Sequence, residues 1–325
     1  MDAGPQENSH ERGERVNVKA FIERKTADIQ RTAGRQKVIS ALSGGVDSST
    51  CTVLAARAIG ANLRCIFIDD GLMREREPER VREIFRDLGI RVDVVNAQRE
   101  FFAVLKGKVD PEEKRKAFRH KFYSVFGREV FKSQARFLLQ GTIKADILET
   151  KGGVKTQHNI LEQIGIDPEK RYGFKVIEPL KDLFKDEVRV VAKALGLPRE
   201  IYSRMPFPGP GLATRVVGEV TLPRVAVVRK ATQIVEEEIA RLNPFQAFAV
   251  LLNDQGTGVE KGTRKFGDII VIRSVESKDA LTAKPTRIPW PVLERITKRI
   301  IKEMPHVTRV AYELTPKPPA TIEYI

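Results

Sequence analysis

The part of this sequence that most constrains its fold is an apolar run that ends in a glycine turn and leads straight into a helical pattern. Residues 38–42 are Val-Ile-Ser-Ala-Leu, as expected for a buried strand, and Ser43-Gly44-Gly45 follows at once. A helical pattern then continues through Leu54 and Ala58. Glycines let a ligand approach the backbone, and the free amide groups and positive dipole end of a helix attract anions. The segment therefore predicts a phosphate-binding turn.

The turn also carries polar side chains suited to a nucleotide. The Asp47 carboxylate would be repelled by phosphates unless a cation lay between them, so we expect Asp47 to hold Mg²⁺. The usual P-loop lysine is missing. An ordinary tight turn would explain a Gly-Gly pair alone, but the whole run favours a nucleotide site. The predicted nucleotide contacts in this turn are Ser43, Gly44, Gly45, Val46, Asp47, Ser48 and Ser49.

Short apolar runs alternate with helical segments over the first two thirds of the chain, as a parallel sheet of strand-helix-strand units requires. The predicted strands are residues 37–42, 62–68, 91–96, 135–141 and 174–177. The predicted helices start at Asn17 and end before Gly34, span 48–59, 77–88, 111–131 and 186–195, and include a short one near Ala145. We expect a flexible tail at residues 1–15 and a doubly wound α/β domain at residues 16–205.

A run of proline and glycine, Pro206-Phe207-Pro208-Gly209-Pro210-Gly211, predicts the boundary to a second domain. The elements predicted beyond it are a strand at 214–220, a helix at 222–242, strands at 245–252 and 268–275, a helix at 291–304 and a strand at 308–314. This β-α-β-β-α-β order is that of a smaller, split α+β domain over residues 206–325.

Composition excludes several classes of protein. Cys51 and Cys65 are too few for a disulfide framework and lack zinc-ligand spacing, so we expect buried apolar roles for them. No apolar run reaches the ~18 residues of a membrane span, and no secretory signal is present, so we expect a cytoplasmic protein without membrane contact. The net charge of +14 suits a polyanion. Because basic runs with interleaved aromatic residues are absent, we do not expect a nucleic-acid partner.

The run from Ser43 to Ser48 resembles the PP-loop of ATP pyrophosphatases, which split ATP between the α and β phosphates. That family includes synthetases of GMP, NAD, asparagine and argininosuccinate, and enzymes that thiolate tRNA. The resemblance implies ATP as cosubstrate, with Mg²⁺, but leaves the second substrate open. We also expect ATP contacts at Ile68 and at Gly141, where a glycine would let the adenine come close.

Two further motifs resemble GMP synthetases, a likeness that spans roughly residues 18–324. The first is residues 68–74, Ile-Asp-Asp-Gly-Leu-Met-Arg, at the predicted end of the second strand, where doubly wound sheets bind ligands. Acidic turn residues are its alternative explanation. The second is residues 110–116, Asp-Pro-Glu-Glu-Lys-Arg-Lys, which is similar to a basic lid over the nucleotides. Its alternative is a solvated basic helix face, although Arg115 and Arg119 share that face with Phe118 and Phe122.

A third likeness joins the run at 206–212 to residues 317–324, Lys-Pro-Pro-Ala-Thr-Ile-Glu-Tyr, which predicts a docked rather than a frayed tail. The resemblance implies that the tail helps to bind xanthosine monophosphate (XMP). The implied XMP contacts are Arg115, Lys317, Thr321, Ile322 and Glu323. The predicted catalytic residues are Asp47, Arg115 and Lys181, the last because a departing pyrophosphate needs a nearby positive charge. A surface lysine before a helix is the alternative for Lys181.

Some positions depart from the family pattern. Residues 258–264, Gly-Val-Glu-Lys-Gly-Thr-Arg, lack the aspartate expected near the XMP base, so either Glu260 substitutes for it or XMP binds differently. Met205 stands where a polar residue is expected, and Gln157 precedes His158-Asn159 where a further histidine is frequent.

The resemblance implies a ligase of GMP and purine biosynthesis: the ATP pyrophosphatase subunit that adenylates XMP, releases pyrophosphate and aminates the product. Cys51 falls in a predicted helix and Cys65 in a predicted strand, so neither is placed as a glutaminase nucleophile. We therefore expect ammonia from a separate glutamine amidotransferase (glutaminase) subunit, and the resemblance implies a homodimer through the second domain. The alternatives are a tRNA-thiolating PP-loop enzyme, which ordinarily needs a reactive cysteine pair, and a non-catalytic nucleotide sensor or RNA-binding module.

Overall fold

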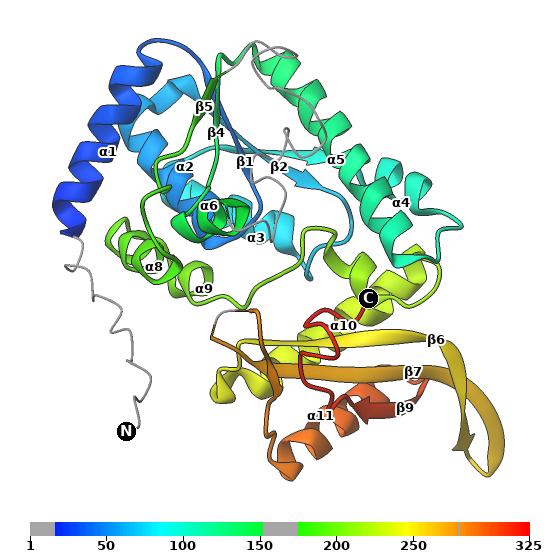
Figure 1. The fold of residues 1–325 in the computed structure, drawn as a ribbon. Coiled ribbons are helices and arrows are strands. Elements are labelled where there is room, and N and C mark those ends of the chain that lie inside the picture. Colours follow the sequence, from blue (N-terminus) through cyan, green and yellow to red (C-terminus); the bar gives the residue numbers. More distant parts are fainter. Residues whose placement is uncertain (1–16, 152–174, 279) are drawn as a thin grey trace, which may run out of the picture.

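The computed structural model describes residues 17–151, 175–278 and 280–325, and these form two sheets, one above the other in Figure 1. The predicted tail at residues 1–15 and the run at 157–159 lie outside the described residues. Within the described part, no helix is long and apolar enough to span a membrane.

In the described residues, five parallel strands form the first sheet, in the order β3-β2-β1-β4-β5. These strands are β1 (Val38–Leu42), β2 (Leu63–Asp69), β3 (Val92–Asn96), β4 (Phe137–Leu139) and β5 (Lys175–Ile177). The accompanying helices are α1 (Val18–Ala33), α2 (Val46–Ile59), α3 (Glu77–Asp87), α4 (Gln98–Leu105), α5 (Pro111–Ser133), α6 (Lys144–Lys151), α8 (Lys185–Ala194) and α9 (Arg199–Tyr202).

Helices cover both faces of this sheet. Val38 and Ile39 point to opposite faces, because side chains alternate along a strand, and they belong to different buried clusters. The cluster of Val38 includes side chains of α1, α2, α3 and α8, and that of Ile39 includes side chains of α4 and α5. In Figure 1, α1 accordingly lies to the left of the sheet and α5 to its right. The predicted doubly wound α/β fold is confirmed.

Local sequence signals set the ends of the first helix as predicted. The Asn17 side chain accepts a hydrogen bond of 3.2 Å from the backbone N–H of Ala20, and Gly34 ends the helix with a φ of 56°. Other elements differ from the prediction, because α4 and α9 were not foreseen and β4 is shorter than the strand expected at 135–141.

The second sheet is built around a long hairpin. Its strands are β6 (Gln246–Glu260), β7 (Thr263–Glu276), β8 (Lys284–Pro285) and β9 (Val307–Tyr312), and its helices are α10 (Leu222–Ile239) and α11 (Trp290–Glu303). Strand β7 pairs antiparallel with β6 and β8 and parallel with β9. Both hairpin strands are longer than predicted, and the short strand β8 was not foreseen.

The strand predicted at 214–220 is wrong. Gly211–Arg215 form a short 3-10 helix, and within 214–220 the described strand pairing is a single bridge from Val216 to Leu251. Val216 and Val220 are apolar because they are buried in the core, not because they join a sheet. The predicted β-α-β-β-α-β order therefore lacks its first strand.

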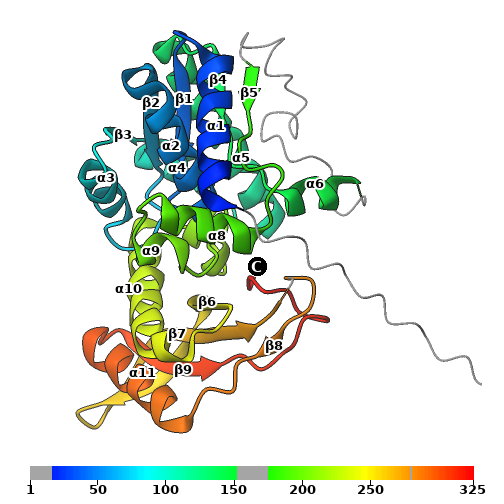
Figure 2. The same cartoon turned by 90° about the vertical axis from the view of Figure 1, so that its left-hand side faces the viewer.

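The two sheets are joined by a continuous hydrophobic core. Buried side chains run from Ile39 and Ile66 of the first sheet, through Phe118 of α5, to Val228 of α10 and Ile270 of β7. The carboxyl terminus lies between the two sheets, as Figures 1 and 2 show from two sides. Because the core crosses it, we keep the division at residue 206 as a proposal.

The turn after β2 is held by its own carboxylates. Asp69 Oδ1 accepts a hydrogen bond of 3.0 Å from Gly71 N–H, and Asp70 Oδ1 accepts one of 2.7 Å from Leu72 N–H. Asp70 is fully buried, and its Oδ2 has no hydrogen-bond partner among the described residues. Burial raises the pKa of Asp70 from 3.8 to about 7.

This raised pKa predicts a pH-dependent stability. Between the ordinary and the raised pKa, the folded protein holds a proton on Asp70 that the unfolded chain has lost, so stability falls as pH rises, by about 1.4 kcal/mol per pH unit. An Asp70→Asn variant keeps the acceptor for Leu72 and cannot ionise. From about pH 5 to about pH 7, wild type should lose about 2 kcal/mol relative to this variant in urea unfolding. The same pH dependence of the free energy of unfolding in wild type and variant would contradict the expectation.

Candidate active site

A cavity of about 550 Å³ opens at the carboxyl ends of β1, β2 and β4. The strand order reverses between β1 and β4, and doubly wound sheets bind ligands at such a point. The cavity brings together six of the predicted site residues: Ser43, Asp47, Ser48, Ile68, Arg115 and Gly141. Its volume falls in the usual range for small-molecule sites.

Hydrogen bonds between hydroxyl and backbone groups shape the turn between β1 and α2. The Ser48 Oγ lies 3.0 Å from Ser43 Oγ and accepts a bond of 3.2 Å from Ser43 N–H. Helix α2 begins at Val46, two residues earlier than predicted, with Gly45 as its N-cap and no side-chain cap. The first amide groups of the helix are thus left to meet an anion, as the sequence predicted.

Asp47 and Lys185 form the main ion pair at this turn. Lys185 Nζ, from the start of α8, donates to Asp47 Oδ2 at 2.5 Å. Burial raises the pKa of Asp47, against the opposing effect of the Lys185 charge, while the Asp146 carboxylate raises it further. Asp47 Oδ1 is buried without a hydrogen-bond partner among the described residues. A buried carboxylate oxygen of this kind is suited to a cation.

The donor set fits Mg²⁺ bound together with a nucleotide. Asp47 and Asp146 both line the cavity, and burial leaves Asp47 Oδ1 facing no protein donor among the described residues. No cluster of three or more His, Cys, Asp or Glu side chains that could enclose a metal occurs in the described ranges. Mg²⁺ ordinarily uses one or two carboxylates, phosphate oxygens and water, so a complete protein cage is not required.

Gly141 has a structural reason to be glycine that the sequence did not reveal. A Cβ atom at Gly141 would lie 3.0 Å from the backbone C of Asp47 and 3.0 Å from the backbone N of Ser48. Gly141 therefore lets the end of β4 pack closely against the start of α2. Gly141 also lines the cavity, so its predicted contact with adenine stays a prediction.

The predicted basic lid is the first part of helix α5, which follows the N-cap Asp110. Arg115, Phe118, Arg119 and Phe122 all line the cavity, as their shared helical face predicted. Phe118 is buried and stacks near Phe122 with ring centroids 6.2 Å apart. The lid thus brings two arginines and two aromatic residues to the cavity wall, and the Arg115 guanidinium pairs there with Glu112 of the same helix.

Other predicted contacts do not face the cavity. The Ser49 side chain is fully buried, Val46 and Gly44 are buried, and none of the three lines the cavity. Lys181 is exposed and also does not line it. The sequence missed Lys185, four residues farther along, because only tertiary packing shows which lysine reaches Asp47.

The carboxyl-terminal tail is docked, as predicted. Ile322 is buried in a small cluster with Val275 and Ala283, and the Thr321 carbonyl accepts a bond of 2.9 Å from Arg273. Lys317 Nζ donates to the Ala280 carbonyl at 2.8 Å. Thr321 Oγ1 donates to the Glu323 carbonyl.

Glu323 is engaged with protein groups. Its carboxylate accepts bonds of 3.1 and 3.0 Å from Arg215 and one of 2.5 Å from Gln246 Nε2. Arg215 lies over the Phe207 ring, and Gln246 also donates to the Pro206 carbonyl. Farther along the same Pro-Gly run, Gly209 and Pro210 line the cavity, so this run connects the tail to it. The predicted XMP contacts of the tail stay predictions.

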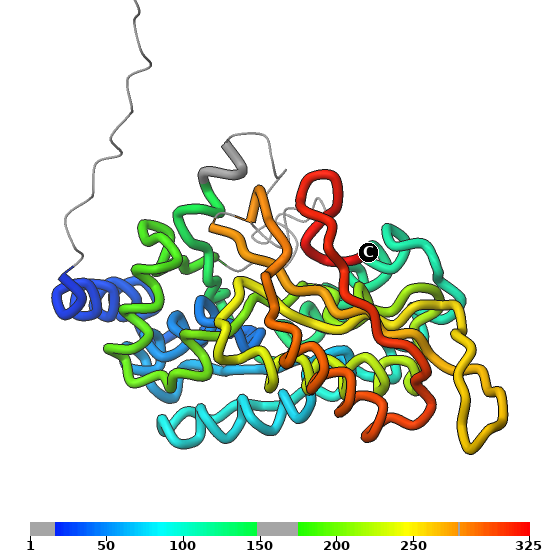
Figure 3. The backbone as a smooth tube through the Cα atoms, turned by 90° about the horizontal axis from the view of Figure 1, so that it is seen from below, coloured from blue at the N-terminus to red at the C-terminus, as the bar shows by residue number. Residues whose placement is uncertain are grey.

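The altered run at 258–264 lies at the free end of the β6–β7 hairpin. Figures 1 and 3 show this end projecting away from the tail of the same chain. Glu260 pairs there with Lys265, at 2.9 Å. Within one chain, Glu260 therefore does not lie beside the tail, and the possibility that it replaces the missing aspartate there is not supported.

A doubly wound sheet with this loop, cavity and basic lid defines an ATP-binding enzyme of the PP-loop class. A family model described as NAD synthase matches residues 17–224, and one described as GMP synthase C terminal domain matches residues 233–324. The chain is 54% identical over 310 residues to a protein of Methanoregula boonei described as a subunit of glutamine-hydrolyzing GMP synthase. That match covers 95% of this chain and 99% of the relative.

Proteins of the same description from Thermococcus kodakarensis and Methanopyrus kandleri are 53% and 50% identical, over 94% of this chain and 98% of each relative. The chain belongs to this family of glutamine-hydrolyzing GMP synthase subunits.

The ion pair at the turn predicts unequal roles for the two lysines. Lys185→Gln removes the positive charge beside Asp47, so ATP cleavage should slow about 100-fold, the usual scale for one such group. Lys181→Gln changes an exposed side chain that is not paired with Asp47 and should slow it less than tenfold. Pyrophosphate release by each purified variant measures the difference. A larger loss for Lys181→Gln would reverse this assignment and restore the role predicted from sequence.

Proposed function

We propose that this chain is the ATP pyrophosphatase subunit of a two-subunit, glutamine-dependent GMP synthase, a ligase that converts XMP to GMP. The observation that carries the proposal is the cavity in which the PP-loop, the basic lid and the Pro-Gly run of the second domain meet. Support for the substrate comes from the match of residues 233–324 to the GMP synthase C-terminal domain and from the relatives described as GMP synthase subunits. No observation on the described residues favours tRNA thiolation.

The proposed reaction has two steps. The C2 oxygen of XMP attacks the α-phosphorus of ATP, the bond from that phosphorus to the bridging oxygen breaks, and pyrophosphate leaves. Ammonia then adds at C2, AMP departs with the former C2 oxygen, and loss of a proton from nitrogen gives GMP. The protein acts mainly through fixed charges and donors.

Residues in the cavity and beside it fit these steps. The amide groups at the start of α2 and Lys185 compensate the charge of the leaving pyrophosphate, with Lys181 retained as a proposed second contact. Arg115 reaches the reacting phosphates from the lid. Asp47, with Asp146 nearby, would hold Mg²⁺, which when bound neutralises phosphate charge. The aromatic residues of the lid keep water from the adenylated intermediate.

Ammonia comes from a separate glutaminase subunit in this proposal. Cys51 and Cys65 are both buried and free. Burial raises the pKa of Cys51 well above its ordinary value and that of Cys65 to about 12. Neither thiol can therefore supply the thiolate that glutamine hydrolysis requires near neutral pH.

We also propose a homodimer through residues 206–325, as the resemblance implies, and a cytoplasmic location. The hairpin end offers apolar surface for such a contact, since Val259 and Phe266 are largely exposed. Phe266→Glu should shift the sedimentation of a dimer toward the monomer. Unchanged sedimentation as a dimer would place the interface elsewhere.

An assay of AMP release with ATP, XMP and ammonium tests the proposed reaction. Turnover should require XMP and should persist without glutaminase when ammonium is supplied. Asp47→Ala should reduce it at least 100-fold while the melting temperature stays close to that of wild type, because Asp47 is placed for the metal and phosphates and not for the core. Turnover that depends on tRNA instead of XMP would overturn the proposal, and an active Asp47→Ala variant would refute the metal role.

A further inference from the structure

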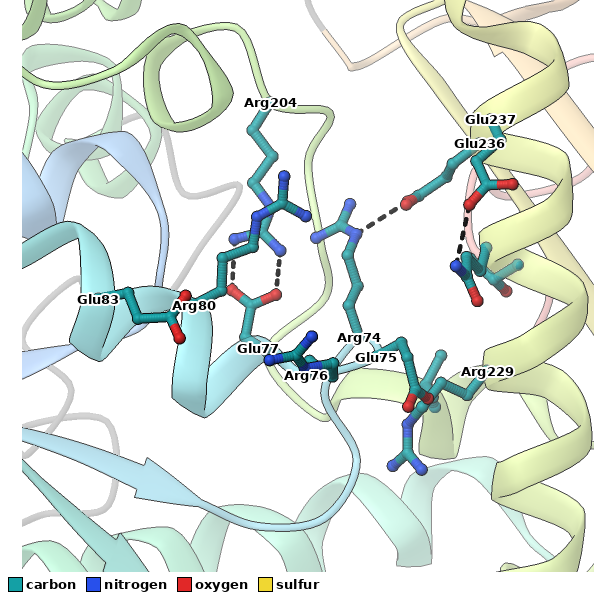
Figure 4. A pocket seen from close by; sticks show the side chains of 13 residues that line it. Arg74, Glu75, Arg76, Glu77, Arg80, Glu83, Arg204, Arg229, Glu236 and Glu237 are labelled. Atoms are coloured by element: carbon teal, nitrogen blue, oxygen red, sulfur yellow. Dashed lines mark hydrogen bonds and ion pairs between the residues drawn. The ribbon is translucent and has the colours of Figure 1, made fainter.

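Behind the PP-loop, on the side away from the ATP cavity, lies a buried ion pair between Glu77 and Arg204. Glu77 is the first residue of α3, and Arg204 follows α9 at the junction with the second domain. The two terminal nitrogens of the Arg204 guanidinium, Nη1 and Nη2, each donate to one carboxylate oxygen of Glu77, as Figure 4 shows. The Glu77 side chain is 5% exposed and that of Arg204 is 21% exposed. This is a paired, fork-shaped contact of the stronger kind.

The pair touches the PP-loop directly. Arg204 Nη1 also donates to the Gly44 carbonyl at 3.1 Å. Gly44 has a φ of 74°, and a Cβ atom there would collide with the Glu77 carboxylate. The pair thus fixes both the direction of the Gly44 carbonyl and the space behind it. Because the peptide plane is rigid, fixing that carbonyl also orients the Gly45 amide.

Neither Glu77 nor Arg204 lines the ATP cavity. Both line a separate charged cavity of about 380 Å³ between α3 and α10. Their connection to the nucleotide site is therefore through the loop, at the Gly44 carbonyl.

The same junction is bonded to the second domain. Arg74 donates to the Met205 carbonyl at 3.2 Å and pairs with Glu236 of α10 at 2.8 Å. The Leu212 N–H donates to the Leu72 carbonyl at 2.7 Å. Arg204 therefore sits where movement of the second domain would reach the PP-loop first.

We propose that Glu77 and Arg204 are positioning residues that hold the PP-loop in its phosphate-binding conformation and couple it to the junction between the domains. The inference rests on the proposed function only for its turnover measurement, since the affinity of the protein for ATP can be measured without XMP.

The test uses Arg204→Lys in the full chain. Lysine keeps the charge but is shorter and lacks the planar fork with which Arg204 bonds both Glu77 oxygens and the Gly44 carbonyl. ATP binding measured by calorimetry without XMP should weaken about tenfold, and kcat for XMP-dependent pyrophosphate release should fall about 10-fold to 100-fold. The exposed pair Arg80–Glu200 supplies a matched control, and Arg80→Lys should change both values less than twofold.

A double variant that exchanges the charges of Glu77 and Arg204 distinguishes a role in positioning the loop from a role in stability alone. Arg204→Glu combined with Glu77→Arg can rebuild the ion pair, but a glutamate at position 204 cannot donate to the Gly44 carbonyl. The double variant should recover melting temperature relative to Arg204→Glu alone and stay impaired in ATP binding. Recovery of ATP binding together with melting temperature would show a purely structural pair and overturn the inference, as would an Arg204→Lys variant with wild-type affinity. A wild type that binds ATP but shows no XMP turnover would instead refute the proposed function.

Discussion

The active cavity depends on the reversal of strand order between β1 and β4. Helices α2 and α5 lie on opposite faces of the sheet, and a space opens between them at this point. The start of α2 lies on one side of this space and α5 on the other. Gly141 lets the end of β4 lie close to the start of α2, because a side chain there would meet the backbone of Asp47 and Ser48. The anion-binding end of α2 is thereby aimed into the cavity.

The negative charge at the start of α2 is balanced by a residue distant in the sequence. Asp47 brings a negative charge to a site that must accept phosphates. Lys185 of α8, 138 residues farther along the chain, forms an ion pair with it. Burial strengthens such interactions, since fewer water molecules screen them. In the proposed reaction, the ion pair between Asp47 and Lys185 would open when phosphates bind, which would leave the lysine available to the leaving pyrophosphate.

Sequence alone could predict the features whose signals are local. The strand, turn and helix from Val38 to Ile59, the Asn17 cap and the shared face of Arg115 and Phe118 each depend on residues close together in the sequence. Features that depend on tertiary contacts escaped it. Apolar residues at 214–220 could serve a strand or a buried 3-10 segment equally well, and helical spacing does not tell Lys185 from Lys181. The partner of Glu77, 127 residues away, carries no local signal at all.

The Pro-Gly run after Arg204 links the carboxyl-terminal tail to the ATP cavity. Its Pro206 carbonyl and Phe207 ring contact Gln246 and Arg215, which both hold the tail carboxylate of Glu323. Gly209 and Pro210 of the same run line the ATP cavity. Arg204, two residues before the run, donates a hydrogen bond to the Gly44 carbonyl of the PP-loop. Proline fixes φ and limits how such a segment can relax, so a shift at the tail would be passed on rather than absorbed. In the proposed function, a second substrate bound by the tail would therefore influence the geometry of the loop that binds ATP.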